Sequence, residues 1–421
     1  MTTETVDTLV VGAGQAGLAM SEHLGNNGVQ HLVLERNRIA ECWRTARWDS
    51  LVANGPAWHD SFPTMDFQGI DPGAFATKEE VTGYFESFAK KINAPVRCGV
   101  EVTLLEKYLG GAGYRVHTSE GEIIANHVVC ATGPFQRPVM PPVVPGDSGI
   151  YQIHSNEYFN PQQLPQGGVL VVGSGSSGSQ IADELLRSGR QVYLSVGPHD
   201  RPPRSYRGRD FVWWLGVLGK WDLATVDPDT AHVTIAVSGA HGGYTVDFRR
   251  YAERGMTLLG MTQHFDNGVL HFAPDLKTNI ENGDRNYLSM LDEADAYVER
   301  NGLALPAELD ARIIGADPQC VIDPVKSLNL DAAGIGSIIW ATGYVNDFSW
   351  IDLDIFDNDG KPLHQRGLSP EPGVYFLGLP WLSRRGSSFI WGVWHDAKYL
   401  ADHITTQHRY LDYHRSVQAK V

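Results

Sequence analysis

Two segments with the same glycine spacing dominate the sequence: Gly12–Gly17 and Gly173–Gly178 both read G-x-G-x-x-G. Each follows a short apolar run, residues 8–11 and 169–172, whose Val and Leu content predicts a buried strand, and each precedes a helix-like pattern. In that context the turn lets a pyrophosphate approach the backbone and interact with the free N–H groups of a helix N-terminus. The pair predicts two bound dinucleotides, and hence electron transfer between them.

The residues that end the following strands predict different nucleotides for the two loops. Glu35 follows the apolar strand 31–34, where a carboxylate can accept hydrogen bonds from an adenosine ribose. Ser195 stands at the equivalent position of the second unit, with arginines nearby. A missing carboxylate favours a 2′-phosphate, so we expect FAD at the first loop and NADPH at the second, with Arg201 and Arg204 as phosphate ligands. The alternative is that these arginines only form a solvated loop.

Size and charge narrow the range of partners. A chain of 421 residues can form two or three domains, each with its own core. Its formal net charge of −15 disfavours nucleic acid and anionic membranes as partners. The N-terminus runs directly into a predicted strand, and no apolar stretch approaches the ~20 residues of a membrane-spanning helix. We therefore expect a cytoplasmic protein without stable membrane insertion, and a homodimer is compatible with the sequence.

Cysteines and histidines give no sign of a redox disulfide or a metal centre. The four cysteines, Cys42, Cys98, Cys130 and Cys320, include no C-x-x-C pair, which excludes a thioredoxin-reductase type of electron transfer. The sixteen histidines include no H-E-x-x-H motif. The sequence therefore predicts no metal site.

Hydrophobic periodicity and turn residues predict an α/β protein with two Rossmann-like domains. The FAD domain is expected at 1–160 and 331–421, and the NADPH domain at 161–330 with a helical insertion at about 205–300. The proline-rich stretch 135–165 is expected to connect the domains, and the chain to return to the FAD domain at 338–343. Other expected elements are an irregular segment from 39 to about 75, helices at 78–91, 211–215, 286–299 and 393–407, and strands at 100–105, 114–118, 122–124, 128–131 and 374–377.

Four short motifs occur in the order found in the class B flavoprotein monooxygenases. Residues 41–44 (Glu-Cys-Trp-Arg) resemble the G-G-x-W-R segment of that family, and Asn54-Gly55-Pro56 matches its N-G-P motif. Residues 154–158 match the second half of its F-x-G-x-x-x-H-S-x-x-Y fingerprint, and 341–344 match its A-T-G-Y segment. Over essentially its whole length the chain resembles this family, which includes flavin-containing, Yucca-type and Baeyer–Villiger monooxygenases, as a diverged, short bacterial-type member.

The sequence departs from the family pattern at two places. Ser148 and Ile150 stand where the fingerprint has Phe and Gly, and neither glycine of G-G-x-W-R is present. Tyr158 stands where Baeyer–Villiger members generally carry Trp, which favours heteroatom oxygenation or another monooxygenation.

The resemblance implies a fold and a reaction. The fold is that of glutathione-reductase-like two-domain flavoproteins, with the NADPH domain inserted in a discontinuous FAD domain. NADPH reduces FAD, and reduced flavin and O2 form a C4a-(hydro)peroxyflavin that oxygenates a small aromatic or apolar substrate at N, S or C. Asn54 is the implied catalytic residue, although an ordinary Asn-Gly turn explains it as well. Alternatives are an NADPH oxidase that produces hydrogen peroxide, and a flavin-binding redox regulator or ion-transport accessory protein.

The resemblance and the loops together assign the site residues. The FAD site is expected to comprise Gly12, Gly14, Gln15, Ala16, Gly17, Glu35, Arg36, Trp43, Arg44, Val102, Thr132 and Gly133. The NADPH site is expected to comprise Gly173, Gly175, Ser176, Ser177, Gly178, Ser195, Arg201, Arg204 and Thr342. Five aromatic residues are candidates for the substrate site, although packing between domains explains them as well: Trp58, His59, Trp213, Trp381 and Trp391.

Overall fold

The first glycine-rich loop lies at the end of the central strand of a seven-stranded sheet. In the computed structural model, which describes residues 4–224 and 234–418, β1 (Glu4–Val11) pairs in parallel with β2 (His31–Glu35) and with β6 (Gly121–Cys130). The last four residues of β1 are buried. A strand at the centre of a parallel sheet is covered on both faces, which explains the uninterrupted apolar run in the sequence.

The outer strands of this sheet come from distant parts of the chain. β3 (Val96–Cys98) extends the sheet beyond β2, and β5 (Tyr114–Thr118) and β4 (Val102–Lys107) extend it beyond β6 as antiparallel strands. β21 (Val374–Phe376) also pairs with β6. The C-terminal part of the chain therefore returns to the first sheet, as the sequence predicts for a discontinuous domain.

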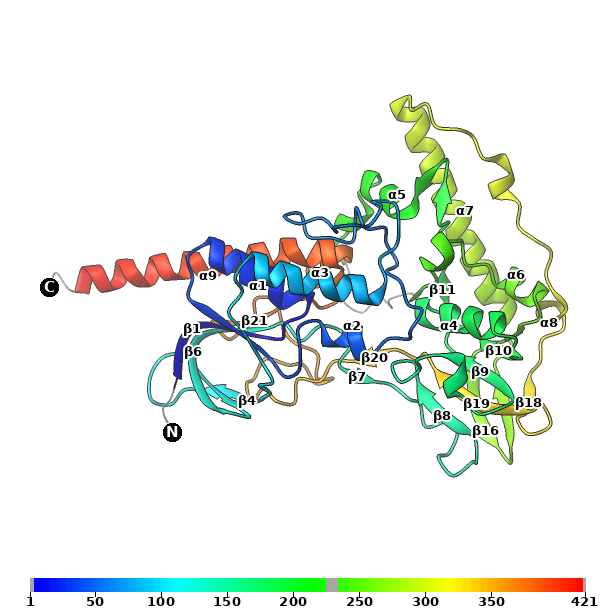
Figure 1. Ribbon diagram of the computed structural model, residues 1–421, viewed down its shortest axis with the longest axis horizontal. Helices are drawn as coiled ribbons and strands as arrows, with labels where there is room; N and C mark the ends of the chain where they lie inside the picture. Colours follow the sequence, from blue (N-terminus) through cyan, green and yellow to red (C-terminus); the bar gives the residue numbers. More distant parts are fainter. Residues whose placement is uncertain (1–3, 225–233, 419–421) are drawn as a thin grey trace.

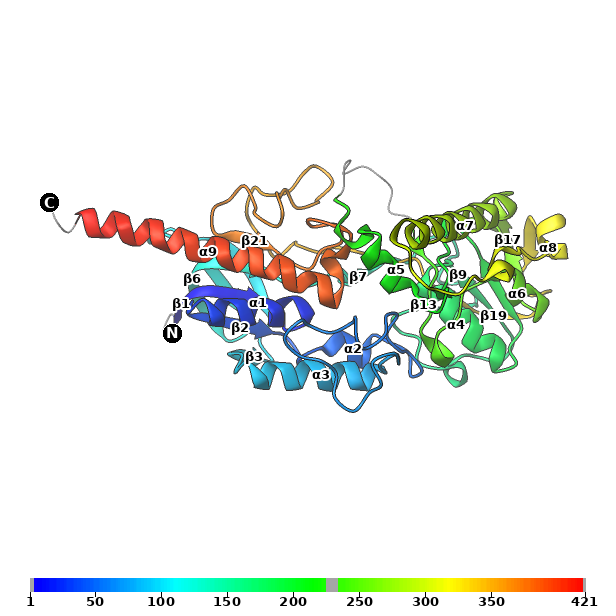
Figure 2. The same cartoon turned by 90° about the horizontal axis from the view of Figure 1, so that it is seen from above.

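Three helices pack beside this sheet. α1 (Gln15–Asn26) begins within the first loop, after Gly14, and contacts both α3 (Lys78–Lys91) and α9 (Ile390–Gln418). In Figure 2, α9 lies alongside α1 and continues past the sheet towards the C-terminus. The predicted helix at 78–91 is confirmed, and a reciprocal capping box between Thr77 and Glu80 fixes its first turn. The predicted helix at 393–407 is confirmed and extends further at both ends.

A second, five-stranded sheet carries the second glycine-rich loop, and all its strands are parallel. Its order is β15 (Thr257–Leu259), β10 (Val192–Ser195), β9 (Gly168–Val172), β19 (Ile335–Trp340) and β8 (Tyr151–His154). α4 (Ser176–Arg187) begins within the loop, after Gly175, and connects β9 to β10. Figure 1 shows the two sheets in separate lobes, side by side. The predicted α/β class with two Rossmann-like domains is confirmed.

The domain boundaries differ from the prediction. β8 and β19 belong to the second sheet, whereas the sequence analysis placed 151–154 in a connector and 338–343 in the first domain. The similarity of Ala341-Thr342-Gly343 to Ala131-Thr132-Gly133 has a structural reason. The two segments follow β19 and β6, which hold equivalent positions beside the glycine-bearing strands of the two sheets.

The segment expected to be helical at about 205–300 is a mixture of helices and short strands. Its helices are α5 (Phe211–Val217), α6 (Phe248–Glu253) and α7 (Leu276–Asn301), which begins earlier than the predicted residue 286. The short helix α8 (Gln319–Ile322) also belongs to the second lobe. The remaining strands form sheets of two or three strands, and each strand has too few residues to show a clear periodicity: β11 (His199–Asp200), β12 (Ser205–Tyr206), β13 (Arg209–Asp210), β14 (Thr234–Ile235), β16 (Thr262–Asp266), β17 (Val269–Phe272) and β18 (Ser327–Asn329).

The remaining elements connect the two lobes. α2 (Glu41–Thr45) opens the segment predicted as irregular, and residues 46–76, all of which are described, contain no helix. β7 (Arg137–Pro138) pairs with β20 (Tyr344–Val345), so the two crossings between the lobes run side by side. The strands predicted at 122–124 and 128–131 form the single strand β6. Over the described ranges, no helix is long and apolar enough to cross a membrane.

A buried carboxylate on α4 makes the stability of the second lobe pH-dependent. Asp183 accepts hydrogen bonds from Arg254 Nη1 (2.6 Å), Arg187 Nε (2.7 Å) and the Tyr244 hydroxyl (2.8 Å). Burial favours a raised pKa, but these hydrogen bonds outweigh it and hold the pKa of Asp183 below 3.8. The stability gained from the ionised group is therefore complete above this ordinary value, and is lost as the pH falls through the lowered one.

We expect Asp183→Asn to destabilise the protein at neutral pH by roughly 1.5–3 kcal/mol, because the amide cannot replace the charge-assisted hydrogen bonds that the buried carboxylate accepts from the exposed Arg187 and Arg254. Its melting temperature should also fall less steeply in acid than that of the wild type. Melting temperatures measured by thermal denaturation from neutral pH down to about pH 3 check both effects. Asp310→Asn, at an exposed carboxylate, is the control. An unchanged acid dependence in Asp183→Asn would contradict this assignment.

Candidate functional site

The two glycine-rich loops share one backbone geometry. Gly12 and Gly173 have φ angles of 107° and 106°, a region that side chains disfavour. A Cβ on Gly12 would lie 2.7 Å from the carbonyl oxygen of Ala131, and a Cβ on Gly173 would lie 2.4 Å from that of Ala341. In each lobe, therefore, the neighbouring strand end presses on the loop so closely that only glycine fits.

The third glycine of each loop is equally restricted. A Cβ on Gly17 would lie 1.8 Å from the Gly12 carbonyl oxygen, and one on Gly178 would lie 1.9 Å from that of Gly173. These contacts let α1 and α4 start immediately beside their strands, so that the first N–H groups of each helix point over the loop. This is the arrangement that a pyrophosphate requires.

The middle glycines differ between the two loops. No atom lies within 4 Å of a Cβ built on Gly14, so the first loop is open above its centre. A Cβ on Gly175 would lie 2.2 Å from Cγ2 of Thr234, and the Ser176 hydroxyl donates to the Ile235 carbonyl (2.8 Å). β14 therefore covers the second loop, and a phosphate placed over Gly175 would meet Thr234.

Glu35 lies beside the first loop, where the sequence analysis expected a ribose ligand. Its carboxylate accepts the Ala13 N–H and the Asn37 N–H, both at 2.9 Å. The Glu35 carbonyl also accepts the Val100 N–H (3.0 Å), which brings the chain leading to β4 to the same place. An ionised carboxylate has about four acceptor positions, so two contacts leave capacity for a ribose hydroxyl. The open loop and this carboxylate together fit an adenine dinucleotide.

The other residues expected at the FAD site differ in their burial and in their contacts. Gln15 Nε2 donates to the Ser388 carbonyl (2.6 Å), and Ala16 is buried under Gly378. Trp43 is half-buried and packs against the cores of both lobes, but Arg44 pairs with Glu86 of α3 (2.5 Å). Arg36 is exposed, and Val102 is half-buried at the start of β4. The Thr132 hydroxyl accepts a hydrogen bond from Gln136 Nε2 (2.9 Å), and the next residue, Gly133, has a φ of 73°.

The histidine of the F-x-G-x-x-x-H-S-x-x-Y fingerprint contacts the segment that follows β19, beside the second loop. His154 is buried, and its Nε2 and Nδ1 lie 3.1 Å from the Gly343 carbonyl and 2.8 Å from Asn156 Oδ1. Burial lowers the pKa of His154. With both ring nitrogens engaged, this histidine positions residues 341–343. Thr342 donates its hydroxyl to the Val139 carbonyl, whereas Ser177 is exposed at the start of α4.

The structure corrects the expected 2′-phosphate ligands. Arg201 is buried, and its Nη2 lies 2.8 Å from Oδ1 of Asp284. Ser195 is also buried, and its hydroxyl donates to the Gly260 carbonyl (2.9 Å). Asp284 lies far along the chain from Arg201, so proximity in sequence could not reveal the pair. Neither side chain is available to a phosphate at the second loop.

Arg204 joins the two lobes instead of facing the second loop. Its guanidinium binds both carboxylate oxygens of Asp210 at 2.5 and 2.7 Å. It also lies between the rings of Phe75 and Phe211, 4.8 and 4.5 Å from their centroids. Burial lowers the pKa of Arg204. Finally, Nη1 donates to the Asn54 carbonyl (2.7 Å), so this arginine fixes a residue of the first lobe.

Asn54 is held between the lobes from two sides. Besides the Arg204 contact to its carbonyl, its side-chain Oδ1 accepts a hydrogen bond from Gln180 Nε2 of α4 (2.8 Å). The following turn is closed by Asp60, which accepts the Gly55 N–H (2.9 Å). With Oδ1 occupied, the amide presents its Nδ2 as a donor. Gln180 is a site residue that the sequence analysis missed, because no motif marks it.

Three of the five candidate substrate residues lie in one aromatic cluster. We call Trp58, His59, Trp221, Phe389 and Trp391 the aromatic cluster. His59 is buried and stacks on Trp221 and Trp391 with ring centroids 5.1 and 5.8 Å apart, and Trp58 lies edge-on to His59. Sequence analysis missed Trp221 and Phe389. Gln15 contacts Ser388, so the cluster begins next to the first loop.

The other two candidates lie differently. Trp213 and Trp58 line an open cavity of about 350 Å³ together with Gly208, Arg209 and Asp210. Ligand pockets of roughly 300 to 1,000 Å³ hold small organic molecules. Trp381 adopts a φ of 56° after β21 and is half-buried there. The structure therefore joins Trp58 and Trp213 through a cavity and leaves Trp381 apart from it.

Comparisons with known proteins place the chain in a family. The family model of pyridine nucleotide-disulphide oxidoreductases matches residues 9–209. An uncharacterized oxidoreductase, CzcO-like, from Geobacillus kaustophilus is 35% identical over 404 residues, which cover 95% of this chain and 98% of the relative. The indole-3-pyruvate monooxygenase YUCCA6 of Arabidopsis thaliana is 30% identical over 413 residues, which cover 94% of this chain and 89% of that enzyme.

The chain belongs to the flavoprotein monooxygenase family. This confirms the resemblance drawn from its motifs, and it makes the protein an oxidoreductase. Among solved structures, a flavin-containing monooxygenase from Stenotrophomonas maltophilia superimposes with a TM-score of 0.66 at 19% identity, over 96% of this chain and 99% of that one. At that identity the likeness shows the common fold of the flavoprotein monooxygenases.

The glycine contacts generate a first test of the site. Gly17→Ala should remove FAD binding and Gly178→Ala should remove NADPH binding, because each new methyl group meets a backbone carbonyl at less than 2 Å. Gly14→Ala should leave the fold intact and weaken FAD binding alone. Fluorescence titration with each dinucleotide measures the affinities.

Gly83→Ala in α3 is the matched control, because a Cβ there meets no atom within 4 Å and no positive φ is involved. It should be neutral or stabilise the protein by up to about 1 kcal/mol. Normal FAD binding by Gly17→Ala would contradict the proposed position of the dinucleotide.

Arg204 gives a second test. Arg204→Met should lower stability by about 3–5 kcal/mol, because Asp210 is left without its buried partner. The KM values for NADPH and NADH should change by the same factor, because the guanidinium does not face the second loop. Arg209→Met, at an exposed neighbour, should leave stability unchanged. A selective rise of KM for NADPH in Arg204→Met would restore the 2′-phosphate assignment.

Proposed function

We propose that this protein is an NADPH- and FAD-dependent monooxygenase that oxygenates a small aromatic or apolar organic substrate at N, S or C. The observation that carries this proposal is the placement of Asn54. Its amide is fixed by Gln180 and its backbone by Arg204, at the junction of the two dinucleotide-binding lobes. A regulator that only bound two nucleotides would need no such fixed amide.

The first loop is the proposed FAD site, because it is open above Gly14 and Glu35 lies beside it. The N–H groups that begin α1 would bind the pyrophosphate, and Glu35 would accept a ribose hydroxyl. When bound, FAD supplies the redox and oxygen chemistry of the reaction. Trp43 packs against both cores and would limit the depth of the flavin site.

The second loop is the proposed NADPH site. It has the same glycine geometry, and the serine at the end of β10 leaves no carboxylate to repel a 2′-phosphate. Arg201 and Arg204 are excluded as ligands of that phosphate by their buried contacts. β14 has to leave Gly175 before the pyrophosphate can reach the first N–H groups of α4.

Asn54 is the proposed catalytic residue. An amide does not titrate near neutral pH, so Nδ2 remains a donor while oxygen chemistry proceeds beside it. A dry surrounding suppresses the wasteful release of hydrogen peroxide. The aromatic cluster adjoins this segment and supplies large apolar surfaces that exclude water, and the cavity at Trp58 and Trp213 is the proposed entry for the substrate.

The decisive variant is Asn54→Ala. In the presence of substrate we expect the hydrogen peroxide released per NADPH consumed to rise at least roughly tenfold, the scale of losing one positioned donor, while the rate of flavin reduction by NADPH changes little. Peroxide assay and stopped-flow absorbance measure the two quantities separately.

Ser50→Ala is the matched control, because Ser50 belongs to the same segment and donates across the same junction, to Glu184 (2.6 Å). It should leave the peroxide yield unchanged. If both variants release peroxide alike, Asn54 only supports packing. If the wild type converts all NADPH to peroxide with every substrate offered, the protein is an NADPH oxidase and the monooxygenase proposal fails.

A further inference from the structure

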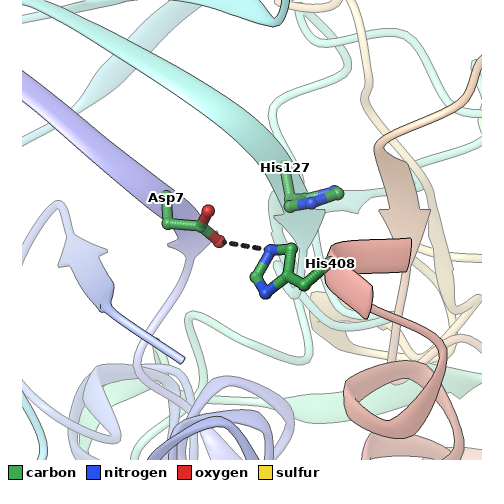
Figure 3. Close-up of side chains that lie close together, drawn as sticks. All are labelled: Asp7, His127 and His408. Atoms are coloured by element: carbon green, nitrogen blue, oxygen red, sulfur yellow. Dashed lines mark ion pairs between the residues drawn. The ribbon is translucent and has the colours of Figure 1, made fainter. Parts of the chain in front are cut away.

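A second group of chemically active side chains lies in the first lobe, away from the glycine-rich loops. Asp7 of β1, His127 of β6 and His408 of α9 point towards one another (Figure 3). One ligand atom from each residue lies within 4.8 Å of the other two, and Nε2 of His408 forms an ion pair with Oδ1 of Asp7 at 3.0 Å. Three elements that are distant in sequence thus converge on one point.

The three side chains differ in the hydrogen bonds that they form. The Asp7 carboxylate is oriented by the Thr8 hydroxyl on Oδ1 (2.9 Å) and by Asn126 Nδ2 on Oδ2 (3.2 Å). His127 is 6% exposed, and its Nε2 has no hydrogen-bond partner among the described residues. A buried polar atom without a partner is uncommon in folded proteins and calls for an explanation.

We propose that Asp7, His127 and His408 form a binding site for a divalent transition-metal ion of the zinc type. Two imidazoles and one carboxylate are a ligand set that zinc prefers, whereas magnesium and calcium prefer oxygen ligands alone. Bonds of about 2.0–2.1 Å in a tetrahedron require ligand atoms about 3.3 Å apart. The ligand atoms of Asp7, His127 and His408 now lie up to 4.8 Å apart, so the side chains have to rotate and approach one another when the ion binds.

The surroundings fit such a site. Asp7 and His408 keep 24% and 27% of their side chains exposed, so an ion can enter and a water molecule can complete the tetrahedron. The hydrogen bonds from Thr8 and Asn126 are of the kind that orients a metal-binding carboxylate. On the other side of His127, the Tyr375 hydroxyl lies 3.4 Å from its Nδ1, which leaves Nε2 free for the ion.

A bound ion would connect α9 to the strands that lead to the first loop. β1 ends at Val11, directly before Gly12, and β6 ends directly before Ala131, whose carbonyl oxygen lies against Gly12. Since α9 also contacts α1, the ion would fix the helix against the part of the lobe that binds the first dinucleotide. This role is structural and does not depend on the oxygenation reaction.

The proposal is tested on full-length protein without an affinity tag, carrying its flavin and freed of metals with a chelator. Zinc chloride titrated into it in a calorimeter should bind at one equivalent per chain and raise the melting temperature in a concentration-dependent way. His408→Ala and Asp7→Asn should each weaken zinc binding at least tenfold and remove the thermal shift. Both positions are partly exposed, so the variants should fold.

Two controls separate this site from adventitious binding. His414→Ala removes an exposed histidine of the same helix, and His264→Ala with His271→Ala removes a stacked pair in the second lobe with ring centroids 4.3 Å apart. Both controls should bind zinc like the wild type. The proposal is overturned if the wild type binds no zinc at millimolar concentration, if His408→Ala binds it unchanged, or if binding is lost in the double variant.

Discussion

The close approach of a backbone carbonyl to a glycine, made once in each lobe, is the constraint on which the rest of the structure depends. Ala131 presses on Gly12, and Ala341 presses on Gly173. Each contact needs three features together: a parallel strand pair that ends in register, a glycine with positive φ, and a helix that starts at once. These features bring the helix N–H groups to the strand ends, where dinucleotides bind in this type of fold. Two such constructions in one chain define an enzyme that uses two dinucleotides.

The junction between the two lobes is held by the contacts of one buried arginine. Arg204 lies between Phe75 of the first lobe and Phe211 of the second, and it binds Asp210 and the Asn54 carbonyl. Desolvating a guanidinium is expensive, and it is offset here by a bidentate carboxylate and two ring faces. The same junction fixes the Asn54 amide through Gln180. The lobes therefore hold the proposed catalytic residue jointly, and neither could position it alone.

Local chemistry could be predicted from the sequence because it depends on neighbouring residues. The glycine loops, the helix at 78–91 and the strand with Glu35 at its end all follow from short-range patterns. The sequence predicts that 338–343 belongs to the FAD domain, whereas β19 pairs with β9 in the second sheet. A repeated motif shows that two positions are equivalent, but not which domain each belongs to. The phosphate role predicted for Arg201 is wrong for a related reason: its partner Asp284 is distant in sequence, and no local pattern indicates that an arginine is buried. Gln180, Trp221 and the group of Asp7, His127 and His408 likewise arise only from tertiary contacts.

The central claim is that electrons from NADPH pass through FAD to O2 and that one oxygen atom ends in an organic product. Turnover under ¹⁸O2 with a panel of small aromatic and apolar amines, sulfides and ketones, followed by mass spectrometry, tests this directly. A monooxygenase should give a product that carries one ¹⁸O atom for each NADPH oxidised, with the second atom recovered in water. Oxidation of NADPH in which all the ¹⁸O is recovered as hydrogen peroxide, whatever substrate is offered, would contradict it.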